Sequence, residues 1–314
     1  MSAAQFALNG RLQHLLTLEG VDRAALTALL DAAESFRTRP GETPRRHDAL
    51  SGRTVVNLFF EPSTRTRSSF ELAARRLGAD VLNLEIGASS AVKGESLEDT
   101  LYTLEAMNAD VFVVRHKEPG VPALLAKHAA SHVHVLNAGE AHLSHPTQGL
   151  LDALTIRLHK PDFASLSVAI VGDIKHSRVA RSAVQALSTL GTRDIRLAGP
   201  RSLLPKKSEL KGELFSDADQ AVAGADVVMM LRIQKERMKK AAVPSASAYF
   251  KRYGLDAKRL KKAKPDALVM HPGPMNRGIE IAADVADGPQ SAIREQVANG
   301  VAVRMAVLQS FYNS

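Results

Sequence analysis

The run Ser63-Thr64-Arg65-Thr66-Arg67 has the residue types of a phosphate-binding helix start. It follows an apolar stretch at 55–60 and a turn containing Pro62, so we expect a strand to stop there and a helix to begin near Thr66. The first N–H groups of a helix lack carbonyl partners within it, and the helix dipole adds positive charge at the same place. Ser63 and Thr64 could cap the helix or bind a ligand, and the guanidinium fork of Arg65 matches phosphate oxygens in pairs. Taken alone, the run is equally explained by an ordinary cap with two solvated arginines.

Further residues that bind phosphate or carboxylate groups follow the other predicted strands. They are Arg115 with His116, His145 with Gln148, Arg178, Arg232 with Gln234, and the turn His271-Pro272-Gly273-Pro274. Ligands of open parallel sheets bind beyond the carboxyl ends of the strands, so these residues predict two clusters of anion ligands. Each of them alone has a plainer explanation, because a single arginine can be a surface residue and a single histidine a hydrogen-bonded structural group.

A loop of small residues at 88–96 contains Ser89 and Lys93 and leads into a helix that Ser96 could cap. Such a loop can reach outward and place one positive charge in a binding site. A solvent-exposed connector is the alternative.

Several common kinds of site are excluded by the sequence. The chain has no cysteine, which rules out disulfides, cysteine-ligated metals and a cysteine nucleophile. The turn after residue 171 has one glycine where a dinucleotide fingerprint needs three, and no phosphate-binding G-x-x-x-x-G-K-[ST] motif occurs. We therefore expect neither a dinucleotide-binding site nor a P-loop nucleotide hydrolase.

Apolar runs and helical patterns alternate along most of the chain. Predicted strands at 54–60, 80–84, 111–115 and 132–136 alternate with helices at 66–77, 96–107, 121–130 and 148–159. A second series has strands at 167–171, 194–198, 226–231 and 267–270, and helices at 177–190, 218–223 and 290–312. An earlier amphipathic segment has Leu26, Leu29, Leu30 and Ala33 on one helical face. Continuous apolar strands between helices indicate parallel sheets covered on both faces.

The 314 residues favour two domains of roughly 130 to 150 residues each. We predict two doubly wound parallel-sheet α/β domains, 1–150 and 151–288, joined by bridging helices, with a C-terminal helix at 289–314 that packs back on the first domain. The N-terminus has no basic segment followed by a long apolar run, which together with the lack of cysteine favours a cytoplasmic protein without a membrane span.

The net charge of +8 comes almost entirely from the segment 235–264, which has eleven Lys and Arg residues against Glu236 and Asp256. Aromatic residues make up only 4% of the chain, so little is available to stack on nucleic-acid bases, and we expect no nucleic-acid partner. The segment is either a solvated basic loop or a source of positive field that attracts small dianionic substrates.

Together, these motifs resemble the aspartate/ornithine carbamoyltransferase superfamily. The stretch Phe59-Phe60-Glu61-Pro62-Ser63-Thr64-Arg65-Thr66-Arg67-Ser68-Ser69-Phe70-Glu71 is similar to its carbamoyl-phosphate motif. The other matching motifs are Lys93-Gly94-Glu95-Ser96, Val114-Arg115-His116, His145-Pro146-Thr147-Gln148, Gly172-Asp173-Ile174-Lys175, Arg232-Ile233-Gln234-Lys235-Glu236-Arg237 and His271-Pro272-Gly273-Pro274. They occur in the family's order from about residue 10 to the C-terminus, and they look like the branch of the family that uses aspartate.

The resemblance implies a role for each matching residue. Carbamoyl phosphate would be bound by Ser63, Thr64, Arg65, Thr66, Ser89, Arg115, His145, Gln148, Gly273 and Pro274, and L-aspartate by Lys93, Arg178, Arg232 and Gln234. The implied catalytic residues are Arg65, Thr66, Lys93, Arg115 and His145, without metal or cofactor. Gly273 stands where the family commonly has Leu, which could loosen the turn, and the family leads us to expect a cis bond before Pro274.

The resemblance also implies a reaction and an assembly. Carbamoyl phosphate and L-aspartate would give N-carbamoyl-L-aspartate and phosphate, an early step of pyrimidine synthesis. The loop with Ser89 and Lys93 would come from a neighbouring subunit, so the active site would be complete in a homotrimer. The resemblance leaves open whether the trimer belongs to a larger assembly with regulatory or dihydroorotase-like chains. Rival explanations are a carbamoyltransferase for ornithine or an acylated ornithine, and a basic scaffold of the same fold without activity.

Overall fold

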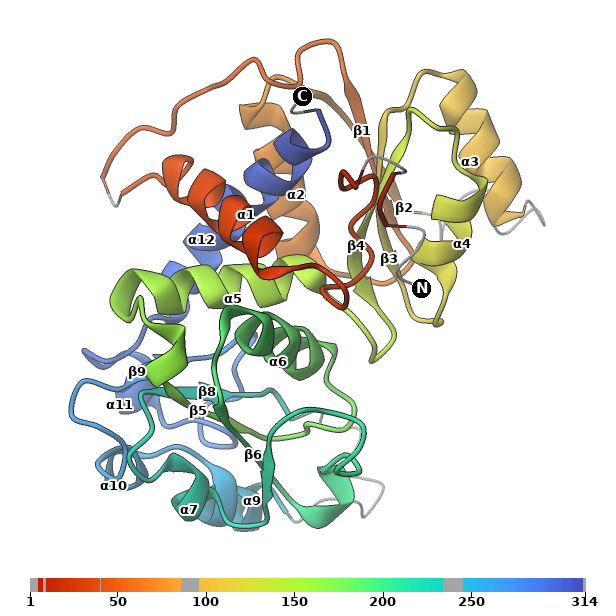
Figure 1. The fold of residues 1–314 in the computed structure, drawn as a ribbon. Helices are drawn as coiled ribbons and strands as arrows, with labels where there is room; N and C mark the ends of the chain where they lie inside the picture. The colour runs from red at the N-terminus through yellow and green to blue at the C-terminus, as the bar shows by residue number, and fades with distance from the viewer. Residues whose placement is uncertain (1–4, 8–9, 40, 86–95, 234–244, 313–314) are drawn as a thin grey trace. The chain divides into compact units, whose positions relative to one another are not determined.

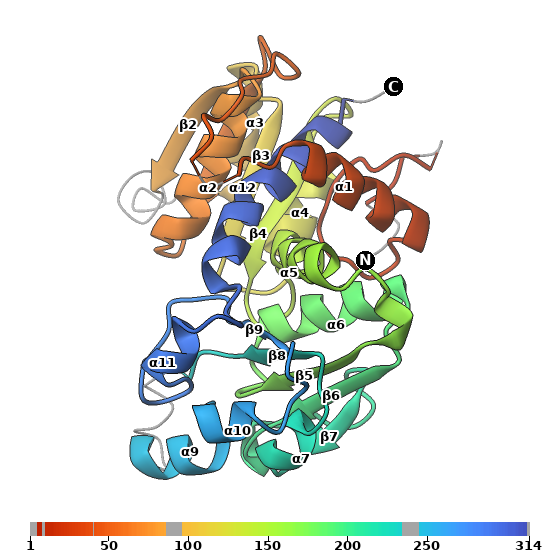
Figure 2. The same cartoon turned by 90° about the vertical axis from the view of Figure 1, so that its left-hand side faces the viewer.

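The computed structural model describes residues 5–7, 10–39, 41–85, 96–233 and 245–312. The chain forms two compact units, one from Met1–Leu150 and Ala298–Ser314 and the other from Leu151–Val297. Each unit contains a parallel sheet with helices packed against it (Figure 1, Figure 2). No helix in the described part of the chain combines the length and the apolar character that a membrane crossing requires.

The described residues of unit 1 contain a four-stranded parallel sheet in the order β2-β1-β3-β4. Its elements are α1 (Arg23–Ser35), β1 (Thr54–Phe59), α2 (Thr64–Arg76), β2 (Asp80–Glu85), α3 (Leu97–Ala106), β3 (Val111–His116), α4 (Val121–His128) and β4 (His134–Glu140). Helices α3 and α4 lie on one face of this sheet and α1 and α2 on the other (Figure 1). The face of α1 that the sequence predicts as apolar, from Leu26 to Ala33, is buried as expected.

The described residues of unit 2 contain a five-stranded parallel sheet in the order β7-β6-β5-β8-β9. Its elements are β5 (Ser167–Val171), α6 (Arg178–Leu190), β6 (Asp194–Ala198), β7 (Glu213–Phe215), α7 (Ala218–Val222), β8 (Val227–Met230), α9 (Ala246–Tyr253), α10 (Ala257–Leu260), β9 (Leu268–Met270) and α11 (Ala283–Ala286). The core contains Val171, Val228, Met230 and Tyr249.

Helices α5 (Pro146–His159) and α12 (Ile293–Ser310) each begin in one unit and end in the other. The last part of α12 packs within unit 1. There the guanidinium of Arg304 lies 4.7 Å from the centre of the Phe70 ring, and Phe311 stacks on His134 at 4.7 Å. The prediction of two doubly wound parallel-sheet domains, with bridging helices and a C-terminal helix that returns to the first, is confirmed.

Both sheets have a point where the strand order reverses. In the first sheet, β2 lies on one side of β1 and the next strand in sequence, β3, lies on the other side. In the second sheet, β6 and β7 lie on one side of β5, and β8 and β9 lie on the other. The carboxyl ends of the strands beside such a reversal leave a crevice because their connections run to opposite faces. Predicted ligand residues of each unit lie at the ends of these strands or follow them, and others follow the next strands along the sheets, β4 and β9.

The carboxyl ends of β5 and β8 approach each other closely. A Cβ atom on Gly172 would lie 2.8 Å from the Cβ of Leu231, and one on Gly199 would lie 2.3 Å from the carbonyl oxygen of Gly172. Any side chain at either glycine would therefore force the strand ends apart. Because neither residue has a side chain, Gly199 can lie against Gly172, and Gly172 can lie against Leu231, the residue before Arg232.

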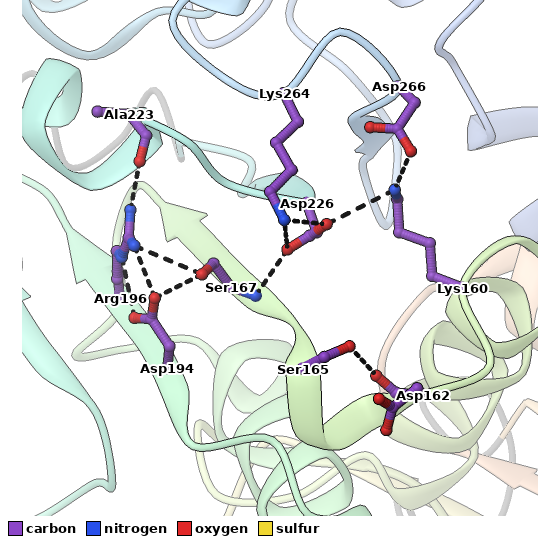
Figure 3. A network of polar contacts seen from close by, with 10 residues as sticks. All are labelled: Lys160, Asp162, Ser165, Ser167, Asp194, Arg196, Ala223, Asp226, Lys264 and Asp266. Atoms are coloured by element: carbon purple, nitrogen blue, oxygen red, sulfur yellow. Dashed lines mark hydrogen bonds and ion pairs between the residues drawn. The ribbon is translucent and has the colours of Figure 1, made fainter.

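The amino ends of β5, β6 and β8 are connected by a charged network (Figure 3). The Asp226 carboxylate accepts hydrogen bonds from the Ser167 N–H at 3.0 Å and from Lys264 Nζ at 2.9 Å, and Lys160 Nζ lies 3.6 Å away. Burial would raise the pKa of Asp226, but these bonds outweigh it and leave the pKa below its ordinary value. Lys264, from the basic segment, therefore has a structural role at the edge opposite the predicted ligand residues.

Two more basic residues of that segment are also paired. Arg259 is buried and lies 2.6 Å from an oxygen of Asp219, and Lys262 lies 2.6 Å from the other oxygen. Lys251, Arg252, Lys258 and Lys261 are exposed. The explanation of the segment as a solvated basic loop is wrong for Arg259, because its guanidinium is buried and bonded to Asp219 in α7 and to the Lys251 carbonyl.

The buried His14 of unit 1 makes the stability of the protein depend on pH. Its Nδ1 accepts a hydrogen bond from the Val135 N–H at 2.9 Å. Burial, aided by nearby His134, lowers the pKa of His14 from 6.5 to about 4. Between these two values the unfolded chain binds a proton that the folded chain does not bind, so acidification through this range favours unfolding.

We predict that His14→Asn will weaken this dependence, since the Asn oxygen can still accept from Val135. Between pH 7 and pH 5 the wild type should lose about 2 kcal/mol more unfolding free energy than the variant. Urea titrations at the two pH values would measure the difference. Equal losses in the two proteins would show that His14 does not titrate in this way.

Candidate active site

Helix α2 presents its amino end directly after β1. The helix begins at Thr64, two residues before the expected start, because the Ser63 carbonyl already accepts the Arg67 N–H at 3.0 Å. The N–H groups of Thr64, Arg65 and Thr66 therefore point out of the helix start. The Ser63 side chain makes no capping hydrogen bond to the helix.

Arg115 lies at the end of β3, beside the end of β1. Its Nη1 donates to the Ala138 carbonyl at 3.2 Å, and its Nε is 3.4 Å from an oxygen of Glu61. The side chain is 13% exposed, so these contacts fix the guanidinium close to the strand ends. Sequence reasoning treated Glu61 only as a turn residue, although its place inside the phosphate-binding motif was the signal for such a contact.

His145 and Gln148 follow β4, the neighbour of β3. Both are buried, and the Gln148 N–H donates to the His145 carbonyl at 2.9 Å in the first turn of α5. The buried carboxylate of Glu140, at the end of β4, accepts from the Gly120 N–H and, at 3.0 Å, from the Asn137 side chain, and so connects the start of α4 to β4. No sequence pattern indicated this role for Glu140.

Two further hydroxyl groups lie in this loop and were not predicted. The Oγ of Ser144 and the Oγ1 of Thr147 are buried and have no hydrogen-bond partner within the described residues. Thr147 lies between His145 and Gln148 in the sequence. A hydroxyl in this position could bind the same ligand, because buried polar groups are rarely left without a partner.

Unit 1 thus places its predicted ligand residues on neighbouring strand ends. Along one edge of the sheet, the residues after β1 are Ser63 to Thr66, the residue at the end of β3 is Arg115, and those after β4 are His145 and Gln148. The edge combines helix N–H groups, hydroxyls, guanidinium groups and an imidazole. Such a set can bind a phosphate and polarise a neighbouring carbonyl.

Unit 2 places two arginines on neighbouring strand ends. Arg178 is half-buried at the first position of α6, which Ser177 caps by accepting from the Ala180 N–H at 3.1 Å. Arg232 is exposed and comes two residues after β8, the strand that pairs with β5. Two guanidinium groups at one edge can bind a small molecule with two carboxylates.

The loop between β5 and α6 contains an Asp–His pair whose histidine adds little positive charge beside the two arginines. Asp173 is buried, and its Oδ1 lies 2.9 Å from the Nδ1 of His176. Burial, with smaller effects from Lys175 and Arg181, lowers the pKa of His176. The imidazole is therefore mainly neutral near pH 7.

The turn at 271–274 follows β9. The bond between Gly273 and Pro274 is cis, as expected, and Gly273 has a φ of 64°, in the left-handed region that suits glycine. The Gly273 N–H donates to the Nδ1 of His271 at 2.8 Å. This bond holds the turn although Gly273 lacks the leucine side chain that is common in the family at this position.

The other predicted site residues, Ser89, Lys93 and Gln234, lie outside the described residues. Within the described ranges, no group of three or more His, Asp or Glu side chains is arranged to hold a metal ion.

Comparisons with known proteins agree with this arrangement. Residues 13–158 match the family described as aspartate/ornithine carbamoyltransferase, carbamoyl-P binding domain. Residues 164–311 match aspartate/ornithine carbamoyltransferase, Asp/Orn binding domain. The fold and these matches define a two-domain α/β transferase. The chain belongs to the aspartate/ornithine carbamoyltransferase family.

Solved structures of two enzymes are similar over nearly the whole chain. Aspartate transcarbamoylase from Trypanosoma cruzi, in complex with carbamoyl aspartate and phosphate, is 33% identical, with 95% of each chain covered and a TM-score of 0.83. The same enzyme with N-(phosphonacetyl)-L-aspartic acid is 32% identical, with 97% of each chain covered and a TM-score of 0.84. Ornithine carbamoyltransferase from Thermus thermophilus is 27% identical, with 96% of this chain and 99% of that chain covered and a TM-score of 0.84. The shared fold therefore does not distinguish between the two acceptors.

Proposed function

We propose that the protein is an aspartate carbamoyltransferase, which makes N-carbamoyl-L-aspartate and phosphate for pyrimidine synthesis. The observation that carries the choice of acceptor is the placement of Arg178 and Arg232 on neighbouring strand ends of unit 2. Aspartate has two carboxylates, each of which a guanidinium can bind with paired hydrogen bonds. The acceptor complexes of the Trypanosoma cruzi enzyme, at 32–33% identity, support the same choice.

Carbamoyl phosphate is assigned to the strand ends of unit 1. Its phosphate would lie at the start of α2, where Ser63, Thr64, Arg65 and Thr66 offer N–H, hydroxyl and guanidinium donors. Its carbamoyl group would face Arg115, His145 and Gln148, together with Thr66. Ser89 and the backbone carbonyls of Gly273 and Pro274 complete the set implied by the family motif.

The reaction then needs no covalent intermediate. The amine of aspartate attacks the carbamoyl carbon, a C–N bond forms, and the C–O bond to phosphate breaks. Negative charge develops on the carbonyl oxygen, where Thr66, Arg115 and His145 donate, and one such donor is typically worth about 3 kcal/mol. The departing phosphate oxygen can accept the amine proton, so that phosphate is released as the HPO₄²⁻ dianion, stabilised by Arg65, Lys93 and the helix start. Holding two anions together supplies much of the remaining rate.

Ornithine is the second candidate acceptor, because the Thermus thermophilus ornithine carbamoyltransferase is 27% identical over 96% of this chain. A family ornithine site is expected to contain a cysteine in the H-C-L-P turn, whereas this chain has Pro272 there and no cysteine. An acceptor screen with carbamoyl phosphate should show turnover of aspartate and none of ornithine or acetylornithine. Carbamoylation of ornithine alone would refute our assignment, and salt-sensitive DNA binding without turnover would favour the inactive basic scaffold.

We further propose a homotrimer in which Ser89 and Lys93 act in the neighbouring subunit's site. The prediction is that Arg65→Ala and Lys93→Ala proteins, each inactive, will regain activity when their subunits are mixed and exchanged. Some mixed interfaces then combine two intact halves of a site, so about a tenth to a third of wild-type activity should return. Mass measurement of the hybrids is the control, and correctly formed hybrids without activity would indicate self-contained subunits.

A further inference from the structure

A buried carboxylate connects two segments that bear predicted ligands in unit 2. Glu280 is completely buried, and its Oε1 lies 3.2 Å from the Nε2 of His271. The same oxygen accepts from the Asn276 backbone N–H, and Oε2 accepts from the Asn276 side chain at 3.3 Å. Glu280 has no place in the reaction described above, yet a buried carboxylate is retained only where its hydrogen bonds compensate for desolvation.

The groups around His271 determine which of its ring nitrogens carries the proton. Its Nδ1 accepts from the Gly273 N–H at 2.8 Å, and a backbone N–H can only donate. The proton of the neutral ring therefore sits on Nε2, facing Glu280. Glu280 thus holds the imidazole in the one tautomer that can bind the Gly273 N–H and keep the 271–274 turn in place.

The side chain of Asn276 extends this connection to the end of β8. Its Nδ2 donates to the Ile233 carbonyl at 3.1 Å as well as to Glu280. Ile233 is buried and directly follows Arg232, whose side chain is exposed. Because both hydrogens of the amide are used, the asparagine is held in one orientation, and that orientation anchors the backbone next to Arg232.

We propose that Glu280 is a positioning residue for the transfer reaction, and that it acts through Asn276 on Arg232 and through His271 on the turn at 273–274. The proposal rests on the proposed function for the roles of Arg232 and the turn. The network has two arms, which are the hydrogen-bonded connections that run from Glu280 through Asn276 and through His271. The Asn276 arm serves the acceptor, and the His271 arm serves carbamoyl phosphate.

Substitutions can separate the two arms. Asn276→Ala removes the anchor on Ile233 but leaves the contact between His271 and Glu280. Glu280→Gln keeps the size of the side chain but removes its charge, which weakens the hydrogen bonds of both arms. It also places an amide N–H₂ where one oxygen accepted, so that one donor is left facing a donor. Asp284→Asn is the matched control, because Asp284 is an exposed carboxylate of the neighbouring α11.

The test measures both KM values, kcat and hydrogen exchange of the peptide covering 227–233 in the full-length protein. Asn276→Ala should raise the KM for aspartate about ten-fold while the KM for carbamoyl phosphate changes by less than about two-fold. Glu280→Gln should raise both, and Asp284→Asn neither. Exchange at 227–233 should be faster in Asn276→Ala and unchanged in Asp284→Asn.

Unchanged exchange in Asn276→Ala, or a fall in kcat with both KM values preserved, would overturn the proposal. If Glu280→Gln does not fold, the KM split of Asn276→Ala still decides. If the wild-type protein uses an acceptor other than aspartate, the proposed function is refuted but the proposal for Glu280 is not. The effect of Asn276→Ala on the two KM values would then be measured with that other acceptor. A wild type without any turnover leaves the exchange measurement to decide whether Asn276 anchors the end of β8.

Discussion

Arg65→Ala is expected to lower kcat/KM for carbamoyl phosphate about a thousand-fold, which corresponds to about 4 kcal/mol of transition-state stabilisation. The residue lies in the first turn of α2, where the helix N–H groups point outward. Its guanidinium would face the phosphate, which gains further negative charge on the departing oxygen as the C–O bond breaks. The loss should therefore appear in kcat as well as in KM, because the interaction strengthens as the reaction proceeds.

The matched control for Arg65→Ala is Arg75→Ala on the same helix. The Arg75 side chain is 58% exposed, and its Nε is paired with Glu71 at 3.0 Å one turn away. This variant should keep its turnover, with a stability change of less than about 0.5 kcal/mol. Steady-state kinetics and thermal unfolding of both variants are the measurements. Near-normal turnover in Arg65→Ala would remove this residue from the site.

Arg178→Lys is expected to lower kcat/KM for aspartate about a hundred-fold, corresponding to about 3 kcal/mol. Lysine keeps the positive charge but loses the planar fork that binds a carboxylate through two parallel hydrogen bonds. The fold should tolerate the change, because Ser177 and not Arg178 caps α6. Most of the loss should be in the KM for aspartate, with the KM for carbamoyl phosphate nearly unchanged.

Arg193→Lys is the control for this second prediction. Arg193 is exposed and precedes β6, at the amino edge of the same sheet. Both variants would be assayed with aspartate varied at saturating carbamoyl phosphate, and then the reverse. If Arg178→Lys and Arg193→Lys have the same kcat/KM for aspartate, Arg178 does not bind the acceptor. The assignment of aspartate to a pair of guanidinium groups would then be wrong for Arg178.

The regular parts of the fold were predictable because they depend on local patterns. Apolar runs and helical periodicity located the strands of both sheets except β7, a strand of three residues with no long apolar run. Helices α9, α10 and α11, of four to eight residues, were also missed, whereas α4 and α7, of similar length, were found within the alternation of strands and helices. The start of α2 was placed two residues late because the sequence does not show which carbonyl accepts the first helical bond.

The candidate site was predictable only in part. Residues at strand ends were found because a parallel sheet brings those ends to one edge. Glu61, Glu140 and Glu280 were not recognised, since each acts through partners that the fold brings to it, such as Arg115, Gly120 or His271. A single carboxylate in a sequence looks the same whether it is solvated or buried, and only the structure shows its donors.

The two ends of the polypeptide meet in one unit. Residues up to 150 and residues from 298 onward share a core, in which Arg304 covers Phe70 and Phe311 stacks on His134. During synthesis on the ribosome, the middle unit can therefore finish folding while the unit that begins first still waits for its last helix. A nonsense mutation in the codons of α12 would then damage the unit whose first strands were translated earliest.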